Sequence, residues 1–213
     1  MIFRDREEAA RLLAKKLSKF RKINLLVLAI PRGAVPMARV IADALQCDLD
    51  VVLVRKIGAP GNPEFAIGAV SEFGDLYLSA AKDIYGISES HIKAIVNQEM
   101  QTIRKRRAAY TPIRKPISLK GRTVLIVDDG IATGATMLAA VRSARTQTAR
   151  KVIVAAPVAS QEAANLLEKE ADETIFLDVP EEFWAISQFY EEFPQVTDDE
   201  VSQILSEAAS AAA

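Results

Sequence analysis

The stretch VLIVDDGIATGATM, residues 124–137, decides the fold that we expect for this chain. Its first part is a continuous aliphatic run, which is typical of a parallel strand buried on both faces. Asp128 and Asp129 follow this run, and residues 132–136 are all small or carry hydroxyl groups. In α/β sheets ligands bind beyond the carboxyl ends of the strands. The stretch therefore predicts a ligand site at the edge of a parallel sheet.

The composition is that of an ordinary globular protein. Of the 213 residues, 50% are hydrophobic and 26% are charged, unlike the composition of disordered chains. This length accommodates one sizeable core with a small addition. The net charge of -1 provides no overall cationic field. Nucleic acid is therefore not expected as a partner.

Neither a membrane span nor a secretory signal is expected. The N-terminal sequence MIFRDREEAARLL carries charges where a secretory signal needs an apolar run. The apolar runs INLLVLAIP and VIVAAPVA are much shorter than the roughly 20 residues that cross a bilayer. The single cysteine, Cys47, excludes an internal disulfide and is interpreted as a small core residue. We expect a cytoplasmic protein with no membrane partner.

Strand and helix patterns alternate along the chain. The expected strands are the aliphatic runs at residues 23–30, 50–56, 123–129, 151–159 and 173–179. The expected helices have apolar residues at helical spacing and span residues 5–20, 35–45, 88–110, 136–145 and 161–171. Asp5 is placed to cap the first of these helices. This alternation predicts an α/β fold with a doubly wound, mainly parallel sheet flanked by helices.

Two segments interrupt the alternation. Residues 57–66 contain two prolines and two glycines, which predicts a mobile loop or, as the alternative, a hairpin. Residues 180–196 are rich in aromatic side chains and predict a small C-terminal hood, after which Thr197 to Glu200 form a capping box that opens a last helix. We therefore expect an α/β core at residues 1–179 and a C-terminal addition at 180–213.

The small-residue loop has the properties of a phosphate site. Glycine and alanine let the backbone approach an anion, while successive N–H groups and the start of the next helix point toward it. Asp128 and Asp129 would repel that phosphate, so we expect them to face vicinal hydroxyls or a divalent cation. A ribose with a 5-phosphate offers both kinds of group. The predicted phosphate cradle comprises Ala132, Thr133, Gly134, Ala135 and Thr136.

These residues resemble the fingerprint of the type I phosphoribosyltransferases. That fingerprint is an aliphatic strand, two acidic residues, two variable positions, a small residue, Thr, Gly, a variable residue and Thr, and residues 124–137 match it throughout. The resemblance implies that Asp128 and Asp129 hold the ribose hydroxyls and Mg²⁺, the metal directly or through water. Residues 31–33, Pro-Arg-Gly, look like the family's pyrophosphate loop. The pyrophosphate-binding residues implied by the resemblance are Arg32, Gly33, Arg55 and Lys56.

The resemblance also implies an activity. The chain would be a pentosyltransferase that moves the 5-phosphoribosyl group from phosphoribosyl pyrophosphate (PRPP) to a nitrogenous base or related acceptor. Mg²⁺, Arg32, Lys56 and backbone N–H groups would stabilise the departing pyrophosphate. The segment at residues 57–72 would act as a lid that excludes water. We expect a homodimer that binds PRPP and a small-molecule acceptor.

The acceptor is less well defined by the sequence. The hypoxanthine-guanine branch of the family carries an aspartate at the position of Ala132, whereas alanine has no proton to exchange. This argues against a 6-oxopurine but leaves adenine, uracil and other acceptors open. Glu64 is the nearest candidate for a general acid or base. The aromatic residues Phe183, Trp184 and Tyr190 are balanced between packing within the hood and stacking on a base.

Two other kinds of protein share features with this sequence. A phosphoacceptor receiver domain also begins with an acidic pair, but it needs a later strand that ends in aspartate, and residues 151–159 end in Ala-Pro-Val-Ala. A regulatory protein that senses a nucleotide or PRPP on the same fold stays open, because sensing and catalysis use the same contacts. The basic run at residues 104–107 is expected to be a solvated helix face, with binding of an anionic substrate as the alternative, and the lone His91 a surface residue.

Overall fold

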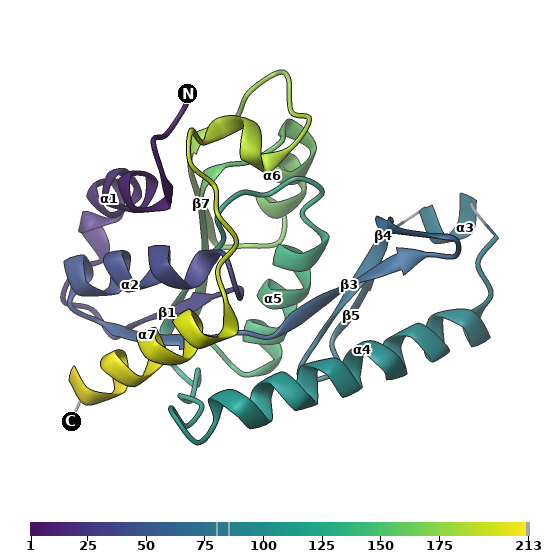
Figure 1. Cartoon of the computed structure of the whole chain (residues 1–213), viewed down its shortest axis with the longest axis horizontal. Coiled ribbons are helices and arrows are strands. Elements are labelled where there is room, and N and C mark those ends of the chain that lie inside the picture. Colours follow the sequence, from purple (N-terminus) through teal and green to yellow (C-terminus); the bar gives the residue numbers. More distant parts are fainter. Residues whose placement is uncertain (80, 85, 212–213) are drawn as a thin grey trace.

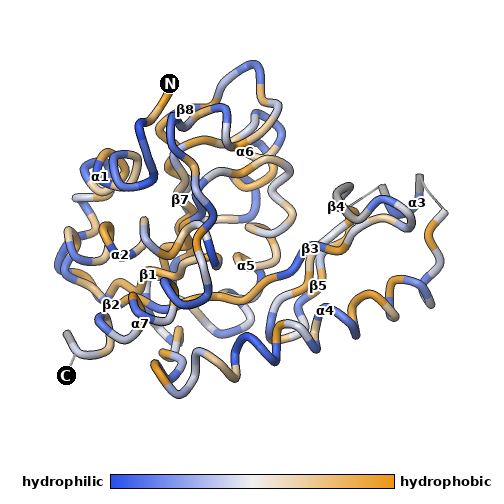
Figure 2. The backbone as a smooth tube through the Cα atoms, in the orientation of Figure 1, coloured by the Kyte–Doolittle hydropathy of each residue, from blue (hydrophilic) through white to orange (hydrophobic). Residues whose placement is uncertain are grey.

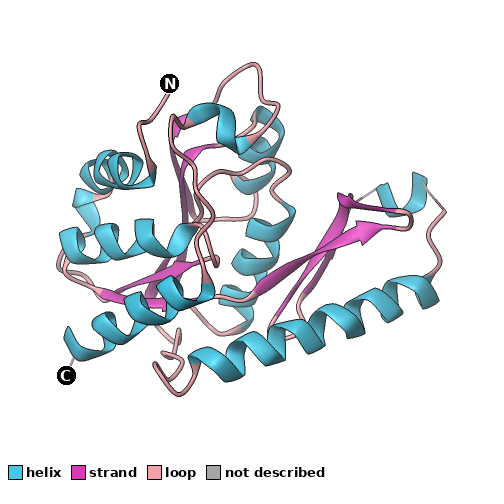
Figure 3. Ribbon diagram, viewed as in Figure 1, coloured by secondary structure: helices cyan, strands magenta, loops and turns pink. Residues whose placement is uncertain are grey.

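The structure, a computed structural model, describes residues 1–79, 81–84 and 86–211. Figure 1 shows an α/β body that carries both chain ends and an arm that projects from one side of this body. The middle of the sequence forms the arm. Two separate sheets are visible in Figure 3, one in the body and one in the arm.

A parallel sheet forms the centre of the body. Its strands are, in spatial order, β2 (Asp48–Val51), β1 (Leu25–Ala29), β6 (Thr123–Val127), β7 (Lys151–Val158) and β8 (Glu173–Asp178). Each neighbouring pair is parallel. Every residue of β1 and β6 is buried, because helices cover both faces of the sheet. The predicted α/β fold with a mainly parallel sheet is confirmed.

The helices of the body form a layer on each face of the sheet. Successive side chains of a strand point to opposite faces, so Val27 packs in one apolar cluster and Leu26 and Leu28 in the other. The 3-10 helices η1 (Ser18–Phe20) and η2 (Ile186–Phe189) complete the body. The helices on the side of Val27 are α1 (Arg6–Lys16), α2 (Ala34–Leu45) and α7 (Asp198–Ala211), and those on the other side are α5 (Ala135–Thr146) and α6 (Gln161–Leu167).

Two helix caps that the sequence predicts are present. The Asp5 carboxylate accepts a hydrogen bond of 2.7 Å from the Glu8 N–H at the start of α1. At the start of α7 the Glu200 N–H donates to the Thr197 hydroxyl at 3.2 Å, and the Thr197 N–H donates to the Glu200 carboxylate at 2.7 Å. These bonds satisfy N–H groups that have no partner within the helix, and they confirm where the two helices begin.

The arm combines an antiparallel sheet with the long helix α4. Its elements are β3 (Val54–Ala59), β4 (Asn62–Ser71), β5 (Leu76–Leu78), α3 (Ala81–Ile84) and α4 (Glu89–Tyr110). The strands pair in the order β3-β4-β5. Along α4 the colours of Figure 2 alternate between hydrophobic and hydrophilic, as expected for an amphipathic helix that packs against β3 and β4.

One prediction for this region is wrong, and one of two alternatives is confirmed. The single strand predicted at residues 50–56 is divided, because the chain leaves the body sheet after Val51 and pairs with β4 from Val54 onward. The loop predicted at residues 57–66 is largely paired backbone, so the hairpin given as the alternative is what forms. Gly61, with a φ of 74°, lies in the turn at the tip of the hairpin. The strand pairing next to this turn is irregular at Gly58.

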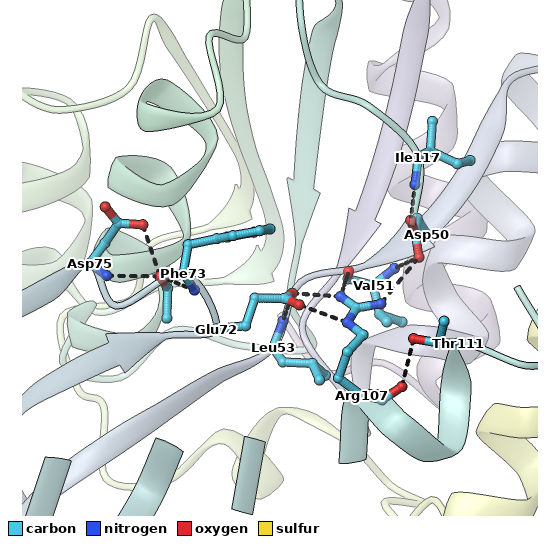
Figure 4. A network of polar contacts seen from close by, with 10 residues as sticks. Asp50, Val51, Leu53, Glu72, Phe73, Asp75, Arg107, Thr111 and Ile117 are labelled. Carbon is cyan, nitrogen blue, oxygen red and sulfur yellow. Dashed lines mark hydrogen bonds and ion pairs between the residues drawn. The ribbon is translucent and has the colours of Figure 1, made fainter. Parts of the chain in front are cut away.

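A network of buried charges joins the arm to the body (Figure 4). Arg107 of α4 forms an ion pair of 2.5 Å with Glu72, and the same nitrogen donates to the Val51 carbonyl at 3.0 Å. Glu72 also accepts from the Leu53 N–H at 3.0 Å. Burial raises the pKa of Asp50, while N–H groups and Arg107, 4.0 Å away, oppose that rise. The network therefore fixes α4 where the chain leaves β2.

This network corrects the interpretation of the basic run at residues 104–107. The Arg107 side chain is only 17% exposed and holds the arm, so it does not belong to a solvated face. Arg104 and Lys105 are exposed, as predicted. Helical residues that are adjacent in sequence point in different directions, which explains why the members of one basic run have different surroundings.

The C-terminal part is integrated into the body. Within the predicted hood, the Phe3 backbone pairs with that of Tyr190, and the Ile186 side chain packs against Gly130. Val201 and Leu205 of α7 are buried in the same cluster as the side chains of α2. The boundary predicted between residues 179 and 180 stays a prediction.

Candidate active site

Two loops that are far apart in sequence meet at the carboxyl ends of β1 and β6. These strands are neighbours in the sheet, so residues 30–33 after β1 and the residues after β6 leave the same edge. A Cβ atom added at Gly33 would lie 2.0 Å from the Asp129 Oδ2 atom. The Gly33 backbone therefore contacts the carboxylate directly, and a larger residue would displace it.

The loop of residues 132–136 forms the start of α5. Gly134 has a φ of 78° and stands at the N-cap, which places the preceding residues at the N-terminal end of the helix. The Ser160 hydroxyl donates to the Ala132 carbonyl at 2.5 Å, and the Ile131 N–H donates to the Val158 carbonyl at 2.9 Å. Ala132 and Thr133 are exposed. An exposed loop at a helix N-terminus is suited to an anion, as the sequence predicts.

The two aspartates after β6 have different surroundings. Asp129 is buried, and its Oδ2 atom accepts a hydrogen bond of 2.9 Å from Arg6 Nε. Asp128 is half-buried, and its Oδ1 atom accepts from the Asp129 N–H at 2.9 Å. Burial and the Asp129 charge hold the pKa of Asp128 well above its usual range. Burial also raises the pKa of Asp129, whereas Arg6 opposes this rise.

Arg6 is fixed by contacts to the hood. Its guanidinium carbon lies 3.7 Å from the centroid of the Phe193 ring, and its Nη1 atom donates to the Pro194 carbonyl at 2.6 Å. The Tyr190 hydroxyl donates to the Asp129 carbonyl at 2.6 Å. The first helix and the hood therefore both hold Asp129 in place. No local pattern indicates this contact, because Arg6 is one of many charged residues on an amphipathic helix.

The predicted pyrophosphate loop leads directly into α2. The peptide bond between Pro31 and Arg32 is cis, and Gly33 is the N-cap of α2. Arg32 is half-buried, and its Nη1 atom lies 3.3 Å from Asp198 Oδ2 at the start of α7. Arg32 thus stands in the loop that follows the carboxyl end of β1, and its part in pyrophosphate binding stays a prediction.

The structure brings only one of the two predicted arm cations to this loop. Arg55 lines a small cavity of about 10 Å³ together with Pro31 and Arg106, and its Nε atom pairs with Glu99 at 2.7 Å. Lys56 is exposed and is the next residue of β3. Because successive side chains of a strand point to opposite faces, the two cations do not face the loop together.

The three candidate aromatic residues are in different surroundings. Tyr190 is buried and stacks on Phe193 with centroids 4.7 Å apart, so the structure favours packing for this ring. Phe183 packs on Phe189 at 5.1 Å. Trp184 is 85% exposed and lies just before η2 in the hood. The Glu64 side chain lies outside the described residues, and its predicted role stays a prediction.

Asp128 and Asp129 are the residues that would hold a metal ion. No cluster of three or more His, Cys, Asp or Glu side chains suited to a metal ion occurs among the described residues. Asp128 and Asp129 supply carboxylates, but Asp129 is already paired with Arg6. Mg²⁺ commonly binds proteins through one or two carboxylates and completes its coordination with water and substrate phosphates. The residues present fit a magnesium ion of that kind.

The fold and the site define the class of type I phosphoribosyltransferases. The chain belongs to the family of the phosphoribosyl transferase domain, whose family model matches residues 4–193. Over the residues that the structure describes, no helix is long and apolar enough to cross a membrane.

Relatives and solved structures agree with this assignment. A protein of Mycobacterium tuberculosis (strain H37Rv), whose name marks it as a proposed phosphoribosyl transferase, is 38% identical over 210 residues, which are 97% of this chain and 47% of the relative. The chain thus spans about half the length of that curated relative. The crystal structure of TT1426 from Thermus thermophilus is 44% identical, with a TM-score of 0.83 and coverage of 97% of this chain and 99% of that chain.

A more distant solved structure has the same fold. The purine phosphoribosyltransferase from Pyrococcus horikoshii has a TM-score of 0.50 at 17% identity and covers 90% of this chain and 92% of its own. At this identity the likeness concerns the fold alone.

Proposed function

We propose that the protein transfers the 5-phosphoribosyl group of PRPP to a nitrogenous acceptor and releases pyrophosphate. The observation that carries this proposal is the contact between the Gly33 backbone and Asp129 at the ends of β1 and β6. That contact places a cationic loop, an acid pair and a helix N-terminus along one edge of the sheet. PRPP presents a pyrophosphate, vicinal hydroxyls and a 5-phosphate, which correspond to these three groups.

Each group has a distinct part in binding. Residues 132–136 at the start of α5 would hold the 5-phosphate through backbone N–H groups and hydroxyls. Asp128 would accept hydrogen bonds from the ribose hydroxyls, because the residue is half-buried, whereas Asp129 is buried and paired with Arg6. Arg32 and the Gly33 backbone would bind the pyrophosphate. These assignments fix the orientation of PRPP along the sheet edge.

The reaction exchanges one bond at the anomeric carbon for another. The bond to the pyrophosphate oxygen breaks, a bond to the acceptor nitrogen forms, and the acceptor loses its proton. Arg32 stabilises negative charge on the leaving group, and Asp128 holds the sugar while positive charge develops on it. Asp128 and Asp129 would hold Mg²⁺, which when bound adds positive charge beside the pyrophosphate. The β3–β4 hairpin, proposed as the lid, would exclude water.

The acceptor stays a separate proposal. Ala132 is exposed beside the phosphate loop and has neither a proton nor a hydrogen-bonding side chain. Hypoxanthine and guanine are therefore expected to be poor acceptors. Glu64 is the proposed acid or base, and the exposed Trp184 is the proposed stacking surface for the acceptor.

Turnover assays separate this function from the alternative, a sensor of PRPP or a nucleotide. Pyrophosphate release would be measured with PRPP, Mg²⁺ and a panel of nucleobases, and Asp128→Asn would be the control for site-dependent turnover. Release with one acceptor supports the transferase. Tight PRPP binding without release for any acceptor supports the sensor, and the absence of PRPP binding contradicts both. Homodimer formation and a cytoplasmic location stay predictions.

A further inference from the structure

Asp198, the first residue of α7, lies among polar groups from two other parts of the chain. The buried Tyr110 donates its hydroxyl to Asp198 Oδ1 at 2.8 Å. Arg32 Nη1 lies 3.3 Å from Asp198 Oδ2, and Arg106 Nε lies 3.8 Å from Oδ1. Figure 1 shows the start of α7 beside the C-terminal half of α4, which carries Tyr110 and Arg106. Two guanidinium groups therefore converge on one carboxylate.

Arg106 faces the predicted pyrophosphate loop. It is half-buried and lines the small cavity that Pro31 and Arg55 also line. Tyr110 lies four residues later on the same face of α4, and its hydroxyl group holds Asp198 by a hydrogen bond. Arg104 of the same basic run is exposed and lines a different cavity, beside Glu72 and Arg107. Position on the helix therefore singles out Arg106 as the member of the basic run beside Arg32.

This cluster resembles an anion site in which the Asp198 carboxylate takes the place of the anion. Guanidinium groups present several N–H donors and bind phosphate and carboxylate oxygens in similar ways. Asp198 carries a single negative charge, so the two arginines keep an excess of positive charge. A pyrophosphate group carries more negative charge and more acceptor oxygens than one carboxylate. It can therefore replace Asp198 between the two guanidinium groups.

We propose that Arg106 is a second pyrophosphate-binding residue, and that Asp198 holds Arg32 and Arg106 until the pyrophosphate group of PRPP displaces it. This inference rests on the proposed function, because it takes Arg32 to be part of the pyrophosphate site. It adds a residue from the arm and a competing carboxylate from the last helix. Binding of pyrophosphate then involves Arg106 of α4 as well as the loop after β1, and it displaces Asp198 at the start of α7.

The test is the affinity of the full chain for inorganic pyrophosphate with Mg²⁺, measured by calorimetry. Arg106→Gln should weaken binding about tenfold, because it removes charge-assisted hydrogen bonds. Arg106→Lys should restore part of the affinity, since it keeps the charge. Arg104→Gln makes the same change in net charge on an exposed part of α4 and should leave the affinity unchanged. Asp198→Asn keeps an acceptor for Tyr110 and should tighten binding severalfold.

Arg32→Gln separates this inference from the proposed function. Loss of affinity in Arg32→Gln together with parental affinity in Arg106→Gln overturns the inference and leaves the pyrophosphate loop in place. Parental affinity in Arg32→Gln, or no pyrophosphate binding by the unmodified protein, overturns both. Weaker binding by Asp198→Asn would show that Asp198 positions the arginines, which contradicts its role as a competitor. Equal losses in Arg104→Gln and Arg106→Gln would show only a general effect of charge and also overturn the inference.

Discussion

Arg6 and Asp129 form an ion pair of 2.9 Å in which each side chain is only 12% exposed. The pair joins the first helix of the chain to the end of β6, and the hood covers it through Phe193 and Pro194. Of the two aspartates in the family fingerprint, Asp129 is therefore committed to an internal partner, whereas Asp128 is more accessible. In the acid pair, Asp129 thus connects parts of the fold, and Asp128 is the residue that we propose contacts a ligand.

The first prediction concerns this ion pair. Arg6→Gln leaves a buried carboxylate without its cation, which should lower the free energy of unfolding by about 3 kcal/mol. Urea denaturation followed by circular dichroism measures this change. Arg11→Gln on the same helix is the control, because Arg11 pairs with Glu7 at the surface and should cost less than about 1 kcal/mol. Equal losses in the two variants would contradict a structural role for the buried pair.

The second prediction separates the two aspartates. Asp128→Asn should weaken PRPP binding about tenfold or more, because sugar hydroxyls lose a charged acceptor, while folding is retained. Asp129→Asn should also weaken binding, but it should lower the free energy of unfolding as well, since Arg6 loses its partner. Calorimetric titration with PRPP and urea denaturation measure the two effects. Parental PRPP affinity in Asp128→Asn would show that the ribose assignment is wrong.

The sequence predicted the body of the fold better than the contacts around the predicted site. Buried parallel strands and a small loop before a helix are local patterns, so residues 124–137 were sufficient to predict β6, α5 and the loop between them. The partners of Asp129 and Arg32 were missed because Arg6 and Asp198 come from opposite ends of the chain. No local pattern distinguishes these two residues from other charges on helix surfaces.

The arm shows a different limit of sequence analysis. The aliphatic run at residues 50–56 looks like one strand, because periodicity does not reveal that the chain moves from one sheet to another. What fixes this transition is the contact of Arg107 with the last residue of β2, Val51, and of Glu72 with Leu53 just before β3. That contact is between residues far apart in sequence, so it becomes visible only in the folded chain.

The third prediction concerns this junction. Arg107→Met removes the cation between Glu72 and Asp50 and should lower the free energy of unfolding by about 3–5 kcal/mol. Arg104→Met, at an exposed position of the same helix, is the matched control and should change stability little. Combining Arg107→Met with Glu72→Gln should recover part of the loss. A double-mutant cycle with no coupling between the two positions would contradict the network.

The fourth prediction concerns pH and Cys47. Burial, followed by the Asp48 charge, raises the pKa of the thiol to about 12. At pH 8 the folded protein should therefore react with iodoacetamide roughly a hundredfold more slowly than the urea-unfolded chain, which is the control. Because the thiol pKa is higher in the folded state, the neutral thiol contributes to the stability of the folded protein. This contribution is complete below the unfolded pKa of about 8.5 and is lost as pH rises toward 12. Equal alkylation rates would contradict burial of the thiol.

The last prediction concerns the contact at Gly33. Its φ of -55° is accessible to alanine, so any effect of Gly33→Ala must come from the space that its Cβ needs, 2.0 Å from Asp129 Oδ2. The substitution should displace the carboxylate or the loop and reduce PRPP binding at least about tenfold. Gly121→Ala is the control, because Gly121 has a φ of 70° but open space around it. That variant should lose about 1 kcal/mol of stability and bind PRPP normally. If Gly33→Ala binds PRPP like the parent, the two loops do not form one site.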